Sequence, residues 1–99
     1  MAAYKLTNKA QDDLLSIGRY TLKEWGVMQR NFYLKQLDAC FSRIAKNPKL
    51  GMSCDFIMAG YRKLPQGRHV IFYKKKSGEV VEIIRVLHKS MDVESNFNQ

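Results

Sequence analysis

The spacing of apolar residues changes near residue 60, and this change constrains the fold more than any other feature of the chain. Before it, one helical face recurs along Ala10, Leu14, Ile17, Thr21 and Trp25, and a second along Tyr33, Leu37, Cys40, Phe41 and Ile44. After it, apolar residues alternate with their neighbours from Arg68 to Tyr73 and from Glu79 to Leu87. The first period is typical of amphipathic helices and the second of strands. The chain therefore combines a helical half with a sheet half.

Local signals set the bounds of two helices. Thr7 or Asn8 can cap the first helix, with Gln11 three residues after Asn8 as in a capping box, and Gly26 is its natural end. Val27 to Asn47 contains neither proline nor glycine and is followed by Pro48, so it predicts a second helix. The connection is too short for any arrangement except an antiparallel hairpin.

Four strands are expected around this hairpin. Ala3 to Leu6 suits an edge strand before the first helix. After a loop from Lys49 to Ala59, we expect short strands over 61–64, 68–73 and 79–87. Pro65-Gln66-Gly67 breaks the strand over 61–64 and separates it from the strand over 68–73. The polar loop 74–78 joins the last two strands as a hairpin.

These elements predict one α+β domain over residues 1–99. Its order is an N-terminal strand, an α-helical hairpin, a three-stranded antiparallel meander and a short polar tail, Met91 to Gln99, with one helical turn. The hairpin should cover one face of the sheet and leave the other face partly open.

Charge and composition restrict the function. The formal net charge is +8, and residues 61–89 contribute eight cations against Glu79 and Glu82, which favours an anionic partner. The sequence has no membrane-spanning run and its first residues have no signal-peptide core, so we expect a cytoplasmic protein without membrane contact. Cys40 and Cys54 are too few for a disulfide framework and should be small core residues.

No motif for cofactor chemistry is present in the sequence. It lacks a glycine-rich phosphate loop, a metal-spaced cluster of His or Cys and a nucleophile motif, so we assign no cofactor, no metal ligand and no catalytic residue. The Lys74-Lys75-Lys76 run is typical of a solvated turn. Trp25, Tyr33 and Phe41 lie at helical spacing and should belong to the core.

Arg85 interrupts an apolar strand, where a charge needs a partner. By alternation it shares a face with Ile83 and Leu87. It can be paired with an acid such as Glu82 or Asp92, or it can bind an anion on the open face beside Arg62 or Arg68. His88 follows at the end of the strand, in a position suited to acid–base work but more often occupied by an ordinary surface residue, and His69 is a weaker candidate.

Several fragments, placed in the right order, resemble the ParE branch of the RelE/ParE toxins. They are Leu6-Thr7, Asp13-Leu14, Trp25-Gly26, Asn47-Pro48, Gly60-Tyr61-Arg62, His69 to Tyr73 and Ile84 to Asp92. The most specific is the last, which ends in the arginine-leucine-histidine-x-x-methionine-aspartate pattern.

The resemblance implies a bacterial toxin of a type II toxin–antitoxin pair that stalls DNA gyrase on cleaved DNA and so blocks replication. Such a toxin inhibits by binding and is not an enzyme. On this interpretation the target-binding residues are Arg62, Lys63, Arg68, Arg85, His88, Lys89, Met91 and Asp92. The alternative is ribosome-dependent cleavage of messenger RNA, as in the RelE branch, with His88 as acid or base, although the C-terminal tyrosine of many such nucleases is missing here.

The resemblance also implies a ParD-like antitoxin as a partner in a hetero-oligomer. Apolar residues that lie off the two helical stripes should form a groove for an amphipathic segment of that antitoxin. These residues are Leu15, Leu22, Phe32 and Leu34, with Trp25 within or beside the groove.

Overall fold

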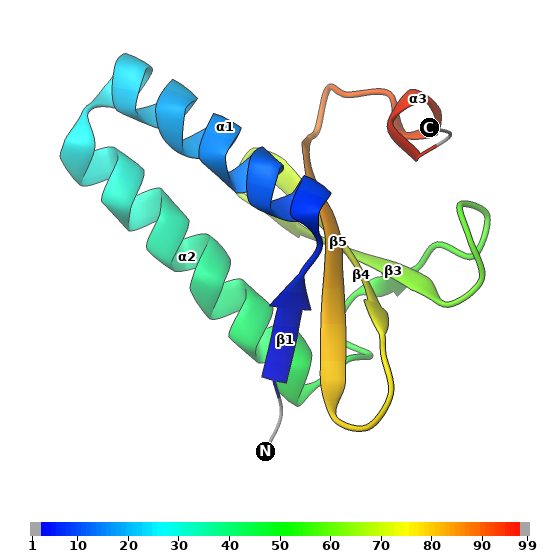
Figure 1. Cartoon of the computed structure of the whole chain (residues 1–99). Coiled ribbons are helices and arrows are strands. Elements are labelled where there is room, and N and C mark those ends of the chain that lie inside the picture. The colour runs from blue at the N-terminus through cyan, green and yellow to red at the C-terminus, as the bar shows by residue number, and fades with distance from the viewer. Residues whose placement is uncertain (1–2, 98–99) are drawn as a thin grey trace.

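Two helices fold back on each other and cover one face of a five-stranded sheet in the computed structural model, which describes residues 3–97 (Figure 1). The elements are, in chain order, β1 (Ala3–Leu6), α1 (Asn8–Trp25), α2 (Val27–Lys46), β2 (Met52–Ser53), β3 (Tyr61–Gln66), β4 (His69–Lys75), β5 (Val80–His88) and α3 (Val93–Phe97). This order confirms the α+β class and the helical hairpin. Positions 98 and 99 of the predicted tail lie outside the described residues.

The sheet is mixed, with strand order β1-β5-β4-β3-β2. Strand β1 lies at one edge, as predicted, and pairs in parallel with β5, with Leu6 opposite Ile83. The other pairs are antiparallel. Strand β2 lies within the predicted loop 49–59 and consists of Met52 and Ser53, opposite Lys63 and Arg62.

Side-chain and glycine signals end the helices much as expected. Thr7 caps α1: its hydroxyl accepts from the Ala10 N–H at 3.0 Å and donates to the Ile84 carbonyl at 2.7 Å. Asn8 lies inside the helix, so its predicted capping-box pair with Gln11 is wrong. Gly26 has φ +91 and separates α1 from α2, which explains why a glycine is needed there.

The main core lies between the hairpin and the sheet. Ala10 and Ile17 of α1 and Leu37 and Ile44 of α2 pack with Tyr73 and other buried strand residues. Cys40 belongs to this core, and Cys54 to a smaller one, so both behave as small buried residues; burial raises the pKa of each thiol. Within residues 3–97, no helix is long and apolar enough to cross a membrane.

The second sheet face is covered in part, by a smaller buried cluster against which α3 packs. Phe72 and Leu87 lie on that face in a second buried cluster. Phe97 of α3 packs on this cluster, with its ring centroid 5.0 Å from that of Phe72 and 5.9 Å from that of Tyr61. Figure 1 shows α3 beyond β5, away from the hairpin. The tail, read as a polar extension, therefore contributes to the core.

A bulge in β5 changes the face on which Arg85 lies. Phe72 pairs with Arg85 but Tyr73 pairs with Ile83, which leaves Ile84 as an extra residue. Ile83 therefore faces the main core, whereas Ile84 belongs to the second cluster. The prediction that Arg85 shares a face with Ile83 is wrong for this reason.

Proline does not interrupt β3 as predicted. The strand continues through Pro65, which lies opposite Val70, to Gln66 opposite His69. Strand β2 pairs only with Arg62 and Lys63. Pro65 thus lies where β3 has no second neighbour, and an edge position tolerates the missing N–H.

Candidate functional site

A cleft lies between the helical hairpin and the ends of β4 and β5. Its volume is about 820 Å³, within the range of small-molecule sites. The side chains that matter for its chemistry are Tyr20 and Trp25 of α1, Tyr33 of α2, Arg68 of the β3–β4 turn, His69, His88, Ser90 and Met91. The fold brings them together because His69 and His88 are register partners in neighbouring strands.

Tyr33 connects α2 to the β3–β4 turn. Its hydroxyl lies 2.6 Å from His69 Nδ1 and 3.3 Å from the Gln66 carbonyl, and it accepts from the Arg68 N–H at 3.1 Å. The turn can approach this ring because Gly67 has φ +59, and a Cβ there would lie 2.7 Å from Tyr33. Burial raises the pKa of Tyr33, so the phenol stays protonated and can donate to His69.

The two imidazoles lie edge to face, with ring centroids 5.4 Å apart. Burial, together with the neighbouring His88, lowers the pKa of His69 to about 4, so His69 is neutral near pH 7. If Tyr33 donates to its Nδ1, the proton of His69 is on Nε2. The Ser90 N–H donates to His88 Nδ1 at 3.1 Å, so this ring nitrogen acts as the acceptor.

Arg68 completes the cleft with a positive charge. Its guanidinium lies over the Trp25 ring, 5.7 Å from the centroid, in a cation–π contact. Within residues 3–97, Arg68 is in no ion pair, so the edges of the guanidinium are available for an anion. Trp25 is 59% exposed, which contradicts its predicted place in the core. Phe41, by contrast, is buried as expected.

The structure brings together only part of the predicted target-binding set. Arg68, His88 and Met91 line the cleft. Lys89 is exposed beside them and its N–H donates to the Arg68 carbonyl at 3.0 Å. Asp92 instead caps α3, because its carboxylate accepts from the Glu94 N–H and the Ser95 hydroxyl.

Two further predicted cations lie elsewhere. Arg62 donates from Nη2 to the Gly51 carbonyl at 2.7 Å and to the Lys49 carbonyl at 3.4 Å, which fixes the loop before β2. Lys63 lies over the ring of Phe56, 6.0 Å from its centroid. Neither residue lines the cleft.

Arg85 is held by Asp13 of α1, so the predicted partners Glu82 and Asp92 are both wrong. Arg85 donates from Nε and Nη2 to the Asp13 carboxylate at 2.8 and 2.9 Å. The same carboxylate accepts from the Val86 N–H at 2.9 Å. Hydrogen bonding to Asp13 raises the pKa of Arg85. Glu82 is occupied by Lys74 and Lys76 at 3.9 and 3.7 Å.

The predicted antitoxin-binding residues are divided between two surfaces. Leu15 and Leu34 line a second groove of about 430 Å³ between β1 and the hairpin. There Tyr4 donates a hydrogen bond to Asp38, and burial together with that carboxylate raises the pKa of Tyr4 to about 12. Leu22 and Phe32 are 42% and 56% exposed but line neither cleft, whereas Trp25 lines the first. Leu34 also packs against the main core.

Sequence reasoning missed the joint role of Tyr33, His69 and Ser90. A Tyr on the helical stripe and a His at a strand start were each assigned to ordinary structure. The available signal was register, since the hairpin loop 74–78 places the start of β4 opposite the end of β5. No group of three or more His, Cys, Asp or Glu in residues 3–97 could hold a metal ion.

Comparisons with known proteins agree on one family. The model of the ParE toxin of the type II toxin–antitoxin system parDE matches residues 4–93. The chain is 42% identical over 93 residues to Toxin ParE1 of Mycobacterium tuberculosis, which covers 94% of this chain and 95% of that protein. It is 41% identical over 96 residues to Toxin ParE1 of Caulobacter vibrioides, covering 97% and 98% of the two chains.

A more distant relative and a solved structure extend this result. Toxin ParE of Escherichia coli is 31% identical over 93 residues, covering 94% of this chain and 90% of that protein. A chain from the chromosomal ParDE toxin–antitoxin system of P. aeruginosa superposes with a TM-score of 0.72 at 18% identity, covering 89% of this chain and 95% of the other. The latter likeness supports the fold.

Proposed function

This chain belongs to the ParE toxin family of type II toxin–antitoxin systems, and from that premise we propose that it poisons DNA gyrase. The near-complete match to curated ParE toxins carries the proposal. The toxin binds gyrase while the enzyme holds cleaved DNA, prevents religation and so stops replication.

Inhibition by binding is favoured over catalysis by the way the cations are distributed. Cleavage of a phosphodiester needs cations that converge on the phosphoryl group, together with a base and an acid. Here Arg85 is committed to Asp13 and Arg62 to loop carbonyls, which leaves Arg68 as the predicted cation that lines the cleft. This arrangement supports an anion-binding surface rather than a nuclease centre.

The surface proposed to contact gyrase is the rim of the cleft at Arg68, His88, Lys89 and Met91. Met91 is 50% exposed and Arg68 carries a charge without a carboxylate partner among the described residues. An exposed apolar side chain beside an exposed cation suits an acidic or DNA-associated partner.

A ParD-like antitoxin is proposed to neutralise the toxin by occupying the exposed apolar surface of the hairpin. Leu15, 57% exposed, gives the groove beside β1 an apolar anchor for an amphipathic segment, and Leu22 and Phe32 give a second anchoring surface on the hairpin. Acidic residues of the antitoxin would meet the positive field of the toxin and accelerate the encounter.

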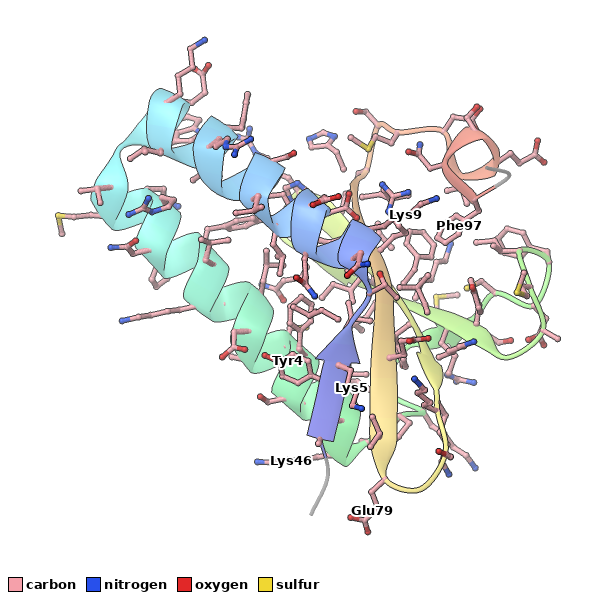
Figure 2. All side chains as sticks on the ribbon, in the orientation of Figure 1. Tyr4, Lys5, Lys9, Lys46, Glu79 and Phe97 are labelled. Atoms are coloured by element: carbon pink, nitrogen blue, oxygen red, sulfur yellow. The ribbon has the colours of Figure 1, made fainter. Side chains whose placement is uncertain are left out.

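One experiment tests the gyrase proposal directly. Purified toxin is added to gyrase with relaxed or supercoiled plasmid; we expect supercoiling to be inhibited and linear DNA to accumulate. Arg68→Gln should raise the inhibitory concentration roughly tenfold, the effect of losing about 1.4 kcal/mol of binding. Lys46→Gln, which makes the same charge change at the far end of α2 (Figure 2), should have no effect.

The second candidate, cleavage of messenger RNA on the ribosome, is favoured by the hydrogen bond between Tyr33 and His69 beside a free cation. Translating ribosomes are therefore the other arm of the experiment. Message cleavage without linear plasmid DNA would refute gyrase poisoning and establish the nuclease.

A further inference from the structure

The cleft between the hairpin and the sheet contains two exposed aromatic surfaces. Tyr20 is 58% exposed and Trp25 is 59% exposed, and both line the cavity. Two exposed aromatic rings that line one cavity form an apolar surface of the kind that binds ligands. A planar base can stack on such a ring, with little dependence on which base it is.

The same cleft contains an anion-binding group next to the aromatic surface. The guanidinium carbon of Arg68 lies 5.7 Å from the Trp25 ring centroid, and no described residue forms an ion pair with this group. The planar guanidinium fork matches two phosphate oxygens. Nδ1 of His69 and Nδ1 of His88 are occupied by Tyr33 and Ser90 respectively, which leaves Nε2 of each ring as the atom that can donate to a ligand.

This combination matches one chemical class. A bare phosphate would not use Tyr20 and Trp25, and an apolar ligand would leave Arg68 and the imidazoles desolvated without a partner. An acidic side chain of a peptide could pair with Arg68 but has no ring to stack. A ligand with a flat heterocycle next to a phosphate uses both halves, and a volume of about 820 Å³ is sufficient for one nucleotide.

We propose that this cleft binds a single nucleotide unit, with its base on the aromatic surface of Tyr20 and Trp25 and its phosphate at Arg68 and His88. The unit is either a free nucleoside monophosphate or an unpaired nucleotide of a strand. The inference does not depend on gyrase as the target, because it concerns the isolated toxin.

Trp25 is the only tryptophan of the chain, so its fluorescence reports on the cleft directly. Adenosine 5′-monophosphate is titrated into the purified toxin, with adenosine and inorganic phosphate as separate probes. We expect saturable quenching by the monophosphate, and binding at least about tenfold weaker for either half-ligand, since each loses one of two contacts worth more than about 1.4 kcal/mol.

Matched variants separate specific binding from general attraction to a basic protein. Arg68→Gln should weaken binding of the monophosphate at least about tenfold, whereas Lys46→Gln should leave it unchanged. Tyr20→Leu, which preserves bulk at an exposed position, should weaken binding severalfold if the base stacks. Circular dichroism and melting curves verify that each variant is folded.

The source of the nucleotide is decided by a 5′-phosphorylated tetradeoxyadenylate. Tighter binding of this oligonucleotide than of the monophosphate assigns the cleft to a strand, and equal or weaker binding assigns it to free nucleotide. The proposal is refuted if the monophosphate produces no saturable change in a folded toxin, if adenosine binds equally well, or if the Arg68 and Lys46 variants weaken binding to the same extent.

Discussion

The ion pair between Asp13 and Arg85 should be one of the most stabilising contacts of the protein, and its removal should be felt in stability before function. Strand β1 covers β5 only as far as Ile83. Beyond Ile83, the Asp13 carboxylate lies along β5. It accepts two hydrogen bonds from Arg85 and one from the Val86 N–H. Asp13 therefore pairs with the charge of Arg85 and also accepts a hydrogen bond from a backbone N–H that β1 does not reach.

The size of the effect follows from burial. The side chains of Arg85 and Asp13 are only 15% and 13% exposed, so Asp13→Leu would leave a largely buried guanidinium without its partner. Breaking such a pair costs about 3–5 kcal/mol, and the residual exposure places the expected loss near about 3 kcal/mol. At about 4–8 °C per kcal/mol for a domain of this size, Tm should fall by roughly 12–24 °C.

A double-mutant cycle measured by urea unfolding tests this reasoning. Arg85→Met alone should cost about 2–3 kcal/mol, because the carboxylate then lacks its cation. The pair Asp13→Leu with Arg85→Met should lose only about 1–2 kcal/mol, chiefly from the Val86 N–H left without an acceptor. A coupling energy below about 0.5 kcal/mol would refute the proposed role of the pair.

The same double variant decides whether Arg85 contacts the target. The double variant lacks the charge of Arg85 but keeps most of its stability, so a loss of gyrase binding can be told apart from a loss of stability. We expect its inhibition of gyrase at 25 °C to change by less than about tenfold, which corresponds to 1.4 kcal/mol. A larger loss in this folded variant would place Arg85 in the target interface after all.

Three further predictions concern the second core, the imidazole and the hairpin. Phe97→Ala should lower the free energy of unfolding by about 1.5–3 kcal/mol, because the partly buried ring packs on Phe72; chemical denaturation measures this, and a change below about 0.5 kcal/mol would contradict the packing role. The pKa of His69 is lowered from 6.5 to about 4, so between those pH values the unfolded chain binds a proton that the folded chain excludes. The free energy of unfolding should therefore fall as pH decreases through this window, and His69→Gln should remove that part of the slope. Parallel pH profiles of the two proteins would refute this prediction. Leu22→Ser with Phe32→Ser should weaken antitoxin binding in calorimetry and leave gyrase inhibition nearly unchanged, because both side chains are exposed; unfolding of the variant would instead assign them to the core.

The fold was predictable from the sequence wherever one local rule was sufficient. The 3.6-residue stripe, Gly26 and Asn47-Pro48 set both helices to within a residue of their observed bounds. The errors occurred where a neighbouring element changed the outcome. Pro65 continues a strand because β2 does not extend along it. The alternation of β5 fails at Ile84 because a bulge inserts one residue, and periodicity alone does not locate bulges.

The candidate site was harder to predict because its residues come from four separate segments. Sequence patterns identified Arg68 and His88 as individual candidates, but nothing local places Trp25 under Arg68 or Tyr33 beside His69. Those contacts depend on how far the hairpin extends past the end of the sheet. For the same reason the acid that pairs with Arg85 lies 72 positions earlier in the chain and was not among its sequence neighbours.

The placement of the two ion-binding arginines suggests how one small domain separates stability from recognition. Arg85 is nearly buried, bidentate and bound to α3 as well, through the Asn96 carbonyl at 3.1 Å. It thus joins α1, β5 and α3, the elements whose junction sets the position of His88 and the segment after it. Arg68 lies on a two-residue turn, held by one ring contact and free at its edges. A change at Arg85 should therefore alter every activity together through the fold, whereas a change at Arg68 should alter ligand or target binding while the antitoxin surface on the hairpin remains intact.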